Sequence, residues 1–416
     1  MNGSKKFNEY NQKEYKMSNL LEEAKMLSDV IVKNRRYIHE NAESHNNLPI
    51  TTTYVSEKLI GMGYAPVEIC QSGIVALAGG KKPGKTFLLR ADMDALPIVE
   101  ENELKFKSIT QNMHACGHDM HTSMLLGAAQ LLKNHEDEIE GTVKLMFQPA
   151  EETLWGANAM IEAGVLDNPK VDAAMMIHVA SGIPVPTGTI AIPEAGVVSA
   201  AADWFEIKIA GKGGHGAMPN MAVDPINVLA HIHTALQEIN SREIAPGENV
   251  ALTIGQIRAG NTSNVIPDTG FMSGTIRTYS NDVREFIKNR LTEIATGIAS
   301  SFRATAEVVY TKGCPCLTSD EDLTKQIFKY SKELFGEDRV IDMSKLTGGK
   351  KMSGSEDFAF ISELVPTVMV SLGAGSIDEG YLFPLHHPKA SFNENALSTG
   401  AAMYANTAIE WLKNNK

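Results

Sequence analysis

Five short segments of this 416-residue sequence hold most of the side chains that could do chemistry. They combine acids, histidines and one cysteine, and they lie at residues 90–97, 114–119, 148–152 and 385–388 and at His178. Cysteine, histidine and glutamate side chains that converge at one place are suited to bind zinc or a neighbouring divalent metal. The residue types therefore indicate a metal site built from segments far apart in the chain.

The adjacent acids Glu151 and Glu152 indicate which reaction such a metal site could support. Side chains of adjacent residues in a turn point in different directions, so one can bind metal while the other holds a water molecule. A metal lowers the pKa of its water to about 7, and a carboxylate can then take the proton. The acids and histidines are numerous enough for two ions about 3.5–4 Å apart that share a water. This combination is typical of metal-assisted hydrolysis.

The elements that must position these residues follow from the hydrophobic pattern between residues 20 and 197. Short apolar runs predict strands at 73–78, 86–90, 143–147 and 173–177, and longer periodic patterns predict helices at 20–40, 52–64 and 120–133. Such alternation predicts an α/β fold with a mostly parallel sheet. Three of the five segments directly follow a predicted strand, and open α/β sheets bind ligands beyond the carboxyl ends of their strands. We therefore expect the segments to meet at one edge of the sheet. Cys116 should lie near a helix N-terminus, which favours the thiolate.

The pattern changes near residue 200 and predicts a second module. Strands are expected at 204–209, 250–257, 270–278 and 305–310, and helices at 225–239 and 282–303. This is the pattern of an α+β module with helices over one face of an antiparallel sheet. We expect it to be inserted at residues 199–311 into a discontinuous catalytic domain that comprises residues 17–198 and 312–416. Residues 1–16 are expected to form a polar tail, with Met17 as an alternative start.

Composition excludes several classes of function. The chain has 38 basic and 50 acidic residues, a net charge of −12, and no run of lysines and arginines, which argues against nucleic acid or anionic membranes as partners. No stretch approaches the ~20 apolar residues of a membrane span, and no apolar stretch follows the two early lysines as it would in a secretory signal. Four cysteines are too few for a disulfide framework, so a reducing, cytoplasmic location is expected.

Nine motifs together resemble the two-metal amidohydrolase/aminoacylase family, which includes hippurate hydrolases, indole-acetyl-amino-acid hydrolases, N-acyl-amino-acid deacylases and related carboxypeptidases. The motifs are RADMDALPI (90–98), HACGHDMH (114–121), QPAEE (148–152), His178-Val179, GKGGHGAMP (211–219), NVIPD (264–268), GTIR (274–277), GSEDFA (354–359) and LHHPK (385–389). The resemblance runs from about residue 20 to the C-terminus. It implies a metallopeptidase-like catalytic domain with an inserted dimerisation or lid domain, and a homodimer that acts on a small N-acylated amino acid or peptide.

The resemblance also implies roles for individual residues of the larger domain. It implies two divalent ions, zinc or manganese first and cobalt or nickel as further options, and these ligands: Cys116 as the bridge, His118, Glu152, His178 and His386. Glu151 resembles the general base that activates the bridging water and passes its proton to the leaving amine. Asp92, Asp94 and Asp119 would hold the ligands in orientation.

The inserted module carries three further residues that the resemblance singles out. His215 resembles a donor to the substrate carbonyl, which in some relatives comes from the partner subunit. Asn264 and Arg277 resemble residues that grip the substrate carboxylate, for which the two-pronged guanidinium is well suited.

Alternative readings stay open at this point. Carboxypeptidase-type cleavage of peptides is an alternative on the same site, and so is a non-catalytic peptide-binding relative, although it would not need Glu151. A cysteine-nucleophile hydrolase using Cys116 with His114 or His118 is a third possibility, but it leaves the other segments unexplained. Taken alone, His178 could be a core histidine, and the pair Cys314 and Cys316 is expected to be structural.

Overall fold

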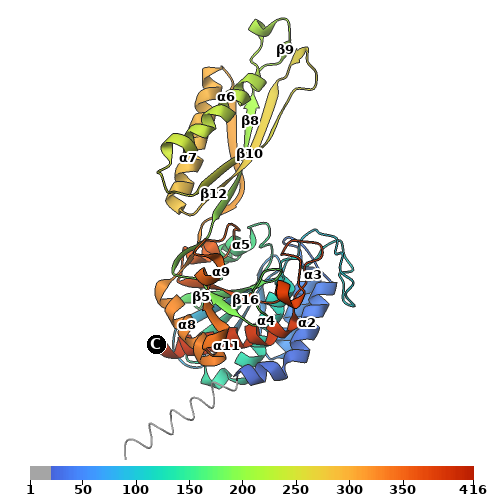
Figure 1. Cartoon of the computed structure of the whole chain (residues 1–416), viewed down its shortest axis with the longest axis vertical. Coiled ribbons are helices and arrows are strands. Elements are labelled where there is room, and N and C mark those ends of the chain that lie inside the picture. Colours follow the sequence, from blue (N-terminus) through green and yellow to red (C-terminus); the bar gives the residue numbers. More distant parts are fainter. Residues whose placement is uncertain (1–19) are drawn as a thin grey trace, which may run out of the picture. The chain divides into compact units, whose positions relative to one another are not determined.

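The computed structural model describes residues 20–416, and these form two compact units (Figure 1). Unit 1 contains the described residues up to Gly196, together with Thr318–Lys350 and Phe360–Lys416, and unit 2 contains Val197–Leu317 and Lys351–Ala359. The polar tail expected at residues 1–16 and the alternative start at Met17 lie outside the described residues. The limits and roles that we expect for the two domains stay predictions.

An eight-stranded sheet forms the centre of unit 1, with the strand order β1-β2-β4-β3-β5-β16-β6-β15. The strands are β1 (Val67–Cys70), β2 (Gly73–Gly79), β3 (Thr86–Asp92), β4 (Thr142–Gln148), β5 (Ala173–Ala180), β6 (Ile190–Ile192), β15 (Val340–Asp342) and β16 (Thr367–Gly373). The central strands β4, β3, β5 and β16 run parallel, whereas β1, β2 and the pair β16–β6 are antiparallel. The expected α/β fold with a mostly parallel sheet is confirmed.

Helices cover this sheet, and they are α2 (Ser28–Glu40), α3 (Pro49–Gly61), α4 (His118–Asn134), α5 (Gly156–Glu162), α8 (Glu321–Phe335), α9 (Ser344–Thr347), α10 (Ala359–Ser362) and α11 (Leu397–Asn414). Strand β3 is buried along its whole length, which requires cover on both faces of the sheet. The helix predicted at 20–40 is present as residues 20–26 and α2, separated only at Leu27. The predicted helix 120–133 begins two residues earlier, at His118, because Gly117 adopts a left-handed conformation at its N-terminus.

The hydroxyl of Tyr404 fixes the most buried helix, α11, to the centre of the sheet. The pairing of β3 with β5 ends at Arg90 and Met176. The Tyr404 hydroxyl lies just beyond this point, where it donates to the carbonyl of Arg90 at 2.7 Å and accepts from the backbone N–H of Ile177 at 2.9 Å. This hydroxyl therefore takes the place of a hydrogen bond between β3 and β5, close to the strand ends where the candidate polar residues lie.

Unit 2 is a four-stranded antiparallel sheet with the order β10-β12-β8-β13. Its main elements follow one another as β8 (Ala201–Ala210), α6 (Pro225–Glu238), β10 (Val250–Ala259), β12 (Thr269–Thr278), α7 (Asn281–Ser301) and β13 (Thr305–Cys314). Both helices pack on the same face of the sheet around one apolar core, which confirms the expected α+β module (Figure 1). Short strands complete the structure: β7 (Gly196–Ser199), β9 (Gly214–His215), β11 (Val265–Ile266) and β14 (Leu317–Ser319).

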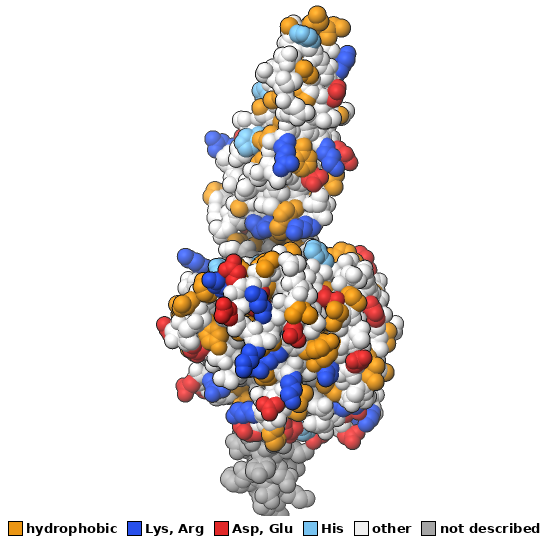
Figure 2. All heavy atoms as spheres, turned by 90° about the vertical axis from the view of Figure 1, so that its right-hand side faces the viewer, with side chains coloured by type: hydrophobic (Ala, Val, Ile, Leu, Met, Phe, Trp, Pro, Cys, Tyr) orange, Lys and Arg blue, Asp and Glu red, His pale blue; other side chains and the backbone are white. Residues whose placement is uncertain are grey.

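The surface carries charges of both signs. On the face shown in Figure 2, acidic and basic side chains are interspersed over each unit. None of the helices within residues 20–416 is both long and apolar enough to cross a membrane. None of the four cysteines forms a disulfide, and burial raises the pKa of the Cys314 thiol to about 12, so this thiol stays protonated.

We expect Tyr404→Phe to lower the free energy of unfolding by about 1–3 kcal/mol, because the buried N–H of Ile177 and the carbonyl of Arg90 lose their partner. Chemical denaturation followed by circular dichroism measures this loss. The matched control is Tyr54→Phe, which removes a half-buried hydroxyl bonded only to Asn34 and should cost less. Equal losses in the two variants would contradict the bridging role of Tyr404.

Candidate metal centre

The candidate residues of unit 1 meet where the parallel strands end. Asp92 is the last residue of β3, the 148–152 segment begins at the last residue of β4, and His178 lies near the end of β5. The sequence predicted that His178 would follow its strand. It lies within β5 instead, because pairing with β16 continues this strand to Ala180. The segments therefore converge at one edge of the sheet, and the prediction of a shared edge holds in this respect.

Three groups of potential ligand atoms overlap at this edge. In each group the donor atoms lie within 4.8 Å of one another. The groups are Cys116, His118 and His178; Cys116, Glu152 and His386; and His118, Glu151 and Glu152. Because the groups share members, all five predicted ligands and the predicted base belong to one continuous cluster.

Two histidines of the cluster are held in the orientation that a metal ligand needs. The Nδ1 atom of His118 lies 2.8 Å from the carbonyl oxygen of Asp94, and Nδ1 of His178 lies 2.8 Å from that of Val179. A carbonyl oxygen only accepts, so each Nδ1 carries a hydrogen and each Nε2 keeps its lone pair when the ring is neutral. The Nε2 of His178 lies 3.5 Å from the Cys116 sulfur. The Nε2 of His118 is buried and, within residues 20–416, has no hydrogen-bond partner.

The charges around Cys116 favour its thiolate. Burial alone raises the pKa of this thiol, but the charge of His178 and the nearby imidazole rings of His118 and His178 outweigh burial and lower the pKa to about 6. Hydrogen bonds to Cys116 and Glu152 raise the pKa of His386 to about 10, and the His386 Nε2 lies 3.4 Å from Glu152 Oε1. These donors attract a positive charge. A divalent cation fits them, since it would also bind the unpartnered Nε2 of His118.

The carboxylate of Asp94 positions the turn that carries both glutamates. It is fully buried, and its oxygens accept the backbone N–H groups of Glu151 at 3.0 Å and Glu152 at 3.2 Å. The carbonyl oxygen of the same residue holds His118. Asp94 therefore places three members of the cluster at once.

Backbone strain gathers in the same segments. Gly117, directly before His118, has φ 88°, and a Cβ atom there would lie 2.4 Å from a methyl group of Val179. Ala150 and His386 adopt positive φ angles of 55° and 65°, which cost energy for residues other than glycine. The chain thus accepts an unfavourable conformation directly before the glutamates and another at one predicted ligand.

Asp92 belongs to a buried chain of polar groups behind the cluster. Its two carboxylate oxygens lie 2.7 Å from Arg90 Nη1 and 2.6 Å from His121 Nδ1. The opposite nitrogen of His121 accepts the backbone N–H of Val179 at 2.9 Å, so His121 links Asp92 to the strand of His178. Burial outweighs the charge of Asp92 and lowers the pKa of His121 to about 4, which keeps this ring neutral.

His121 is a residue that the sequence argument did not single out. It stands in the HACGHDMH motif, three positions after His118, and that spacing places both rings on one face of α4. This helical spacing was the available signal. The ring centroids of His121 and His178 lie 4.8 Å apart.

The carboxylate of Asp119, expected to hold the ligands in orientation, bonds to side chains of α2 instead. Its Oδ2 accepts from Arg35 Nε at 2.7 Å and from His39 Nδ1 at 2.9 Å, both on α2. Asp119 thus ties α4 to α2, and any influence on the ligands passes through the helix that carries His118. The nearby His114 is buried, and neither of its ring nitrogens has a hydrogen-bond partner among the described residues, so it is not paired with Cys116.

The three candidates of unit 2 fall into two places. His215 and Asn264 are neighbours, since β9 pairs with β11 and the N–H of Gly216 donates to the carbonyl of Asn264 at 2.9 Å. Arg277 lies near the other end of β12, with its guanidinium 4.4 Å from the centre of the Trp204 ring. The eight steps of β12 from Thr269 to Arg277 span roughly 27 Å. One copy of unit 2 therefore does not bring His215 and Arg277 together.

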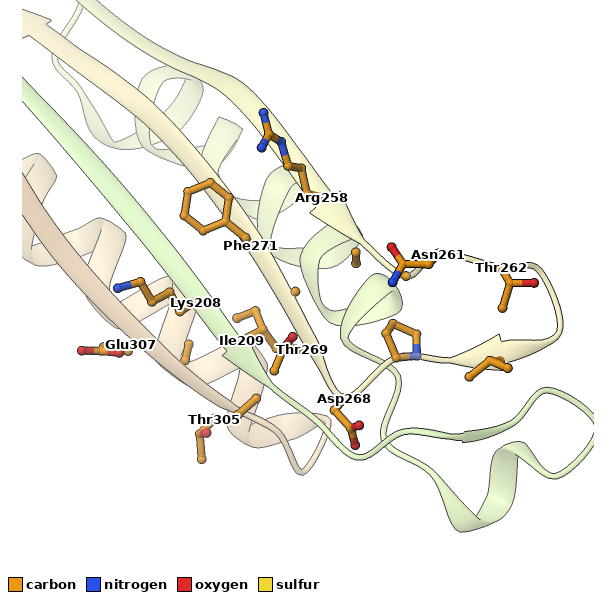
Figure 3. A pocket seen from close by; sticks show the side chains of 17 residues that line it. Lys208, Ile209, Arg258, Asn261, Thr262, Asp268, Thr269, Phe271, Thr305 and Glu307 are labelled. Carbon is orange, nitrogen blue, oxygen red and sulfur yellow. The ribbon is translucent and has the colours of Figure 1, made fainter.

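A pocket of about 980 Å³ lies on the sheet of unit 2, between Lys208, Arg258 and Phe271 on one side and the loop of Asn261 and Thr262 on the other (Figure 3). None of the residues predicted from the sequence to act in catalysis or binding lines it. We assign it no role.

Comparisons with known proteins agree on one family. The model of peptidase family M20/M25/M40 matches residues 88–410. The chain is 39% identical to the IAA-amino acid hydrolase ILR1-like 2 of Arabidopsis thaliana, over 95% of this chain and 88% of that protein. It is 36% identical to thermostable carboxypeptidase 2 of Saccharolobus solfataricus, over 94% of this chain and 98% of that protein. A crystal structure described as a dinuclear metal binding peptidase of the M20 family, from Bacillus subtilis, is 31% identical, covers 94% of this chain and 99% of its own, and superposes with a TM-score of 0.76.

We expect Asp94→Asn to weaken metal binding about 10–100-fold, because the amide group turns one acceptor toward the Glu151–Glu152 turn into a donor. Competition with a chromophoric chelator measures the affinity. Asp172→Asn is the control, since Asp172 also accepts a backbone N–H, from Thr86 at the opposite end of β3. Unchanged affinity in folded Asp94→Asn would show that this carboxylate does not position the ligands.

Proposed function

The chain belongs to peptidase family M20/M25/M40, and from this membership we propose that it is a metal-dependent amidohydrolase that cleaves the amide bond of N-acyl amino acids or small peptides. Membership confirms the resemblance drawn from the nine motifs and the assignment of the chain to the hydrolases. The observation that carries the proposal is the continuous cluster of thiolate, imidazole and carboxylate donors at the edge of the sheet.

The proposed ligands are Cys116, His118, Glu152, His178 and His386, and we propose that they hold two divalent ions. A bridging role for Cys116 is supported because its sulfur is the one donor shared by the group that contains His178 and the group that contains Glu152 and His386. Zinc or manganese are the first candidates, with cobalt or nickel also compatible with these donors. When bound, such ions polarise the amide carbonyl and lower the pKa of a water molecule.

Glu151 is the proposed general base. Its side chain is buried, it belongs to the donor group of His118 and Glu152, and its backbone is held by Asp94. The carboxylate accepts the proton of the attacking water and later delivers it to the nitrogen of the leaving amine, so that the amide becomes a carboxylate and an amine. Asp92 and Asp94 position the cluster, whereas Asp119 acts on it only through α4.

We propose that unit 2 supplies His215 as a donor to the substrate carbonyl, and Asn264 and Arg277 as ligands of the substrate carboxylate. His215 is exposed at one end of the unit, and Arg277 lies at the other. Two such distant residues serve one substrate only if they come from two copies of the chain, which supports a homodimer. Strand β10 offers an edge for such pairing, because none of the strands in the described part of the chain pairs with its outer side.

Cleavage of peptides in the manner of a carboxypeptidase is the second candidate. It is favoured by the similarity to thermostable carboxypeptidase 2, which extends over nearly the whole of both chains. The two candidate functions use the same cluster. They differ only in whether the carbonyl side of the cleaved amide bond belongs to an acyl group or to a peptide. The absence of a disulfide among the four cysteines agrees with the reducing, cytoplasmic location that we propose.

We expect Glu151→Gln to lose about 10²–10⁴-fold in kcat while it keeps its metal, because an amide cannot carry the proton. Steady-state hydrolysis and elemental analysis of the same preparation measure both quantities. The control is Glu162→Gln, which changes an acid of α5 that is bonded only to Asn158. Near-normal turnover in Glu151→Gln would rule out the role of base.

Metal analysis tests the proposal as a whole. We expect close to two divalent ions per chain by elemental analysis, loss of hydrolysis of N-acyl amino acids after chelation, and recovery when metal is added back. A panel that contains both N-acyl amino acids and dipeptides separates the two candidate functions. A chain without metal, or hydrolysis that resists chelation, would contradict the proposal and favour a binding protein or a cysteine hydrolase.

A further inference from the structure

Two neighbouring loops of unit 1 expose large apolar side chains beside the metal centre. The side chains are Ile183 (42% exposed), Ile377 (38%), Leu382 (66%) and Phe383 (36%), here called the apolar rim. The loops touch along their backbones: the N–H of Ile377 donates to the carbonyl of Ile183, and Gly182 is packed so closely that a Cβ atom there would lie 2.3 Å from the carbonyl oxygen of Phe383. The four residues thus come from one continuous part of the surface.

The loops under the apolar rim are rigid. The carboxylate of Glu379 accepts from the backbone N–H and hydroxyl of Thr187 and from the N–H of Ser376, which joins the two loops. Ser376 and Glu379 also form a reciprocal capping box. The ring of Phe383 stacks on that of His387, with centroids 4.5 Å apart and an angle of 19° between the planes. An apolar surface held this firmly loses little entropy when it binds a ligand.

The apolar rim adjoins the proposed ligands through the chain itself. Phe383 stands three residues before His386, so its Cα lies within roughly 11 Å of that ligand. The N–H of His386 donates to the carbonyl of Ala115 at 3.0 Å, which fixes this loop to the segment of Cys116. The second loop leaves β5 after Ala180, two residues beyond His178, and reaches Ile183 three residues later.

Exposed apolar groups that gather on rigid loops mark binding surfaces. We propose that the apolar rim binds the acyl group of the substrate and selects large apolar acyl groups, aromatic ones included, over acetyl. This inference rests on the proposed function, in which the carboxylate of the amino-acid half is held by residues of unit 2. The acyl half, on the other side of the amide bond, is then the part left for the loops of unit 1.

The test compares N-benzoylglycine with N-acetylglycine on the metal-loaded, full-length protein. We expect the wild-type protein to prefer the benzoyl substrate in kcat/KM, and Leu382→Ser to lower that preference about tenfold or more. Leu382 is the most exposed member of the apolar rim, so its replacement spares the core, and Phe383→Ala is a second variant with the same expected direction. Leu364→Ser is the matched control, because Leu364 is 58% exposed but precedes β16 at its opposite end.

Three results would overturn the inference: an unchanged preference in both variants, an equal change in Leu364→Ser, or a larger effect on N-acetylphenylalanine, which carries its apolar group on the amino-acid side. Sedimentation of Leu382→Ser adds a fourth, since loss of a dimer with an unchanged preference would make the apolar rim a subunit contact. Failure of the proposed function looks different, because no substrate would turn over. In that case, calorimetric titration with the two glycine derivatives would still decide whether the apolar rim binds the acyl group.

Discussion

Asp94 is the residue on which the arrangement of the metal centre depends. Its carboxylate accepts the backbone N–H groups of Glu151 and Glu152, and its carbonyl oxygen fixes the ring of His118. One buried residue, two positions after β3, therefore couples the turn after β4 to the first turn of α4. A carboxylate taken out of water requires such partners, because an unbonded buried charge is far more costly than a bonded one. The same bonds that satisfy Asp94 thus hold the candidate base and ligands next to one another.

The surrounding structure supports this arrangement by strain and by paired charges. Ala150 and His386 adopt positive φ angles in the cluster, and such conformations of residues other than glycine persist only where many other contacts determine the backbone. Behind the cluster, the chain from Arg90 through Asp92 to His121 fixes the strand of His178 from the opposite side. The candidate ligands are therefore held from two directions before any cation binds. Such preorganisation lowers the reorganisation needed in a hydrolytic reaction.

Unit 2 does not bring its candidate residues together in one place. Its apolar core and its alternating strands are sufficient to form the sheet, and the polar candidates sit at the two ends of that sheet rather than in one pocket. Arg277 is stacked on Trp204, whereas His215 stands on the small two-stranded sheet of β9 and β11, beyond the start of β12. This separation is the reason that the proposed substrate capture requires two copies of the chain. In the proposed function, unit 2 supplies charged contacts to the substrate and the apolar rim supplies apolar ones.

The sequence by itself determined the classes of both units, the approximate places of most strands and helices, and the chemistry of the cluster, because hydrophobic periodicity and residue type are local properties. Even the shared edge of the sheet followed from the position of each segment after a predicted strand. The local pattern misplaced details: α4 begins at His118, directly after the left-handed Gly117, and β5 includes His178, because pairing with β16 continues that strand to Ala180. Only the tertiary structure decided that His121 links Asp92 to β5, that Asp119 faces Arg35 and His39, and that His215 and Arg277 lie apart. The partners of a buried polar group depend on which distant segments pack against it, and no spacing along the chain records that choice.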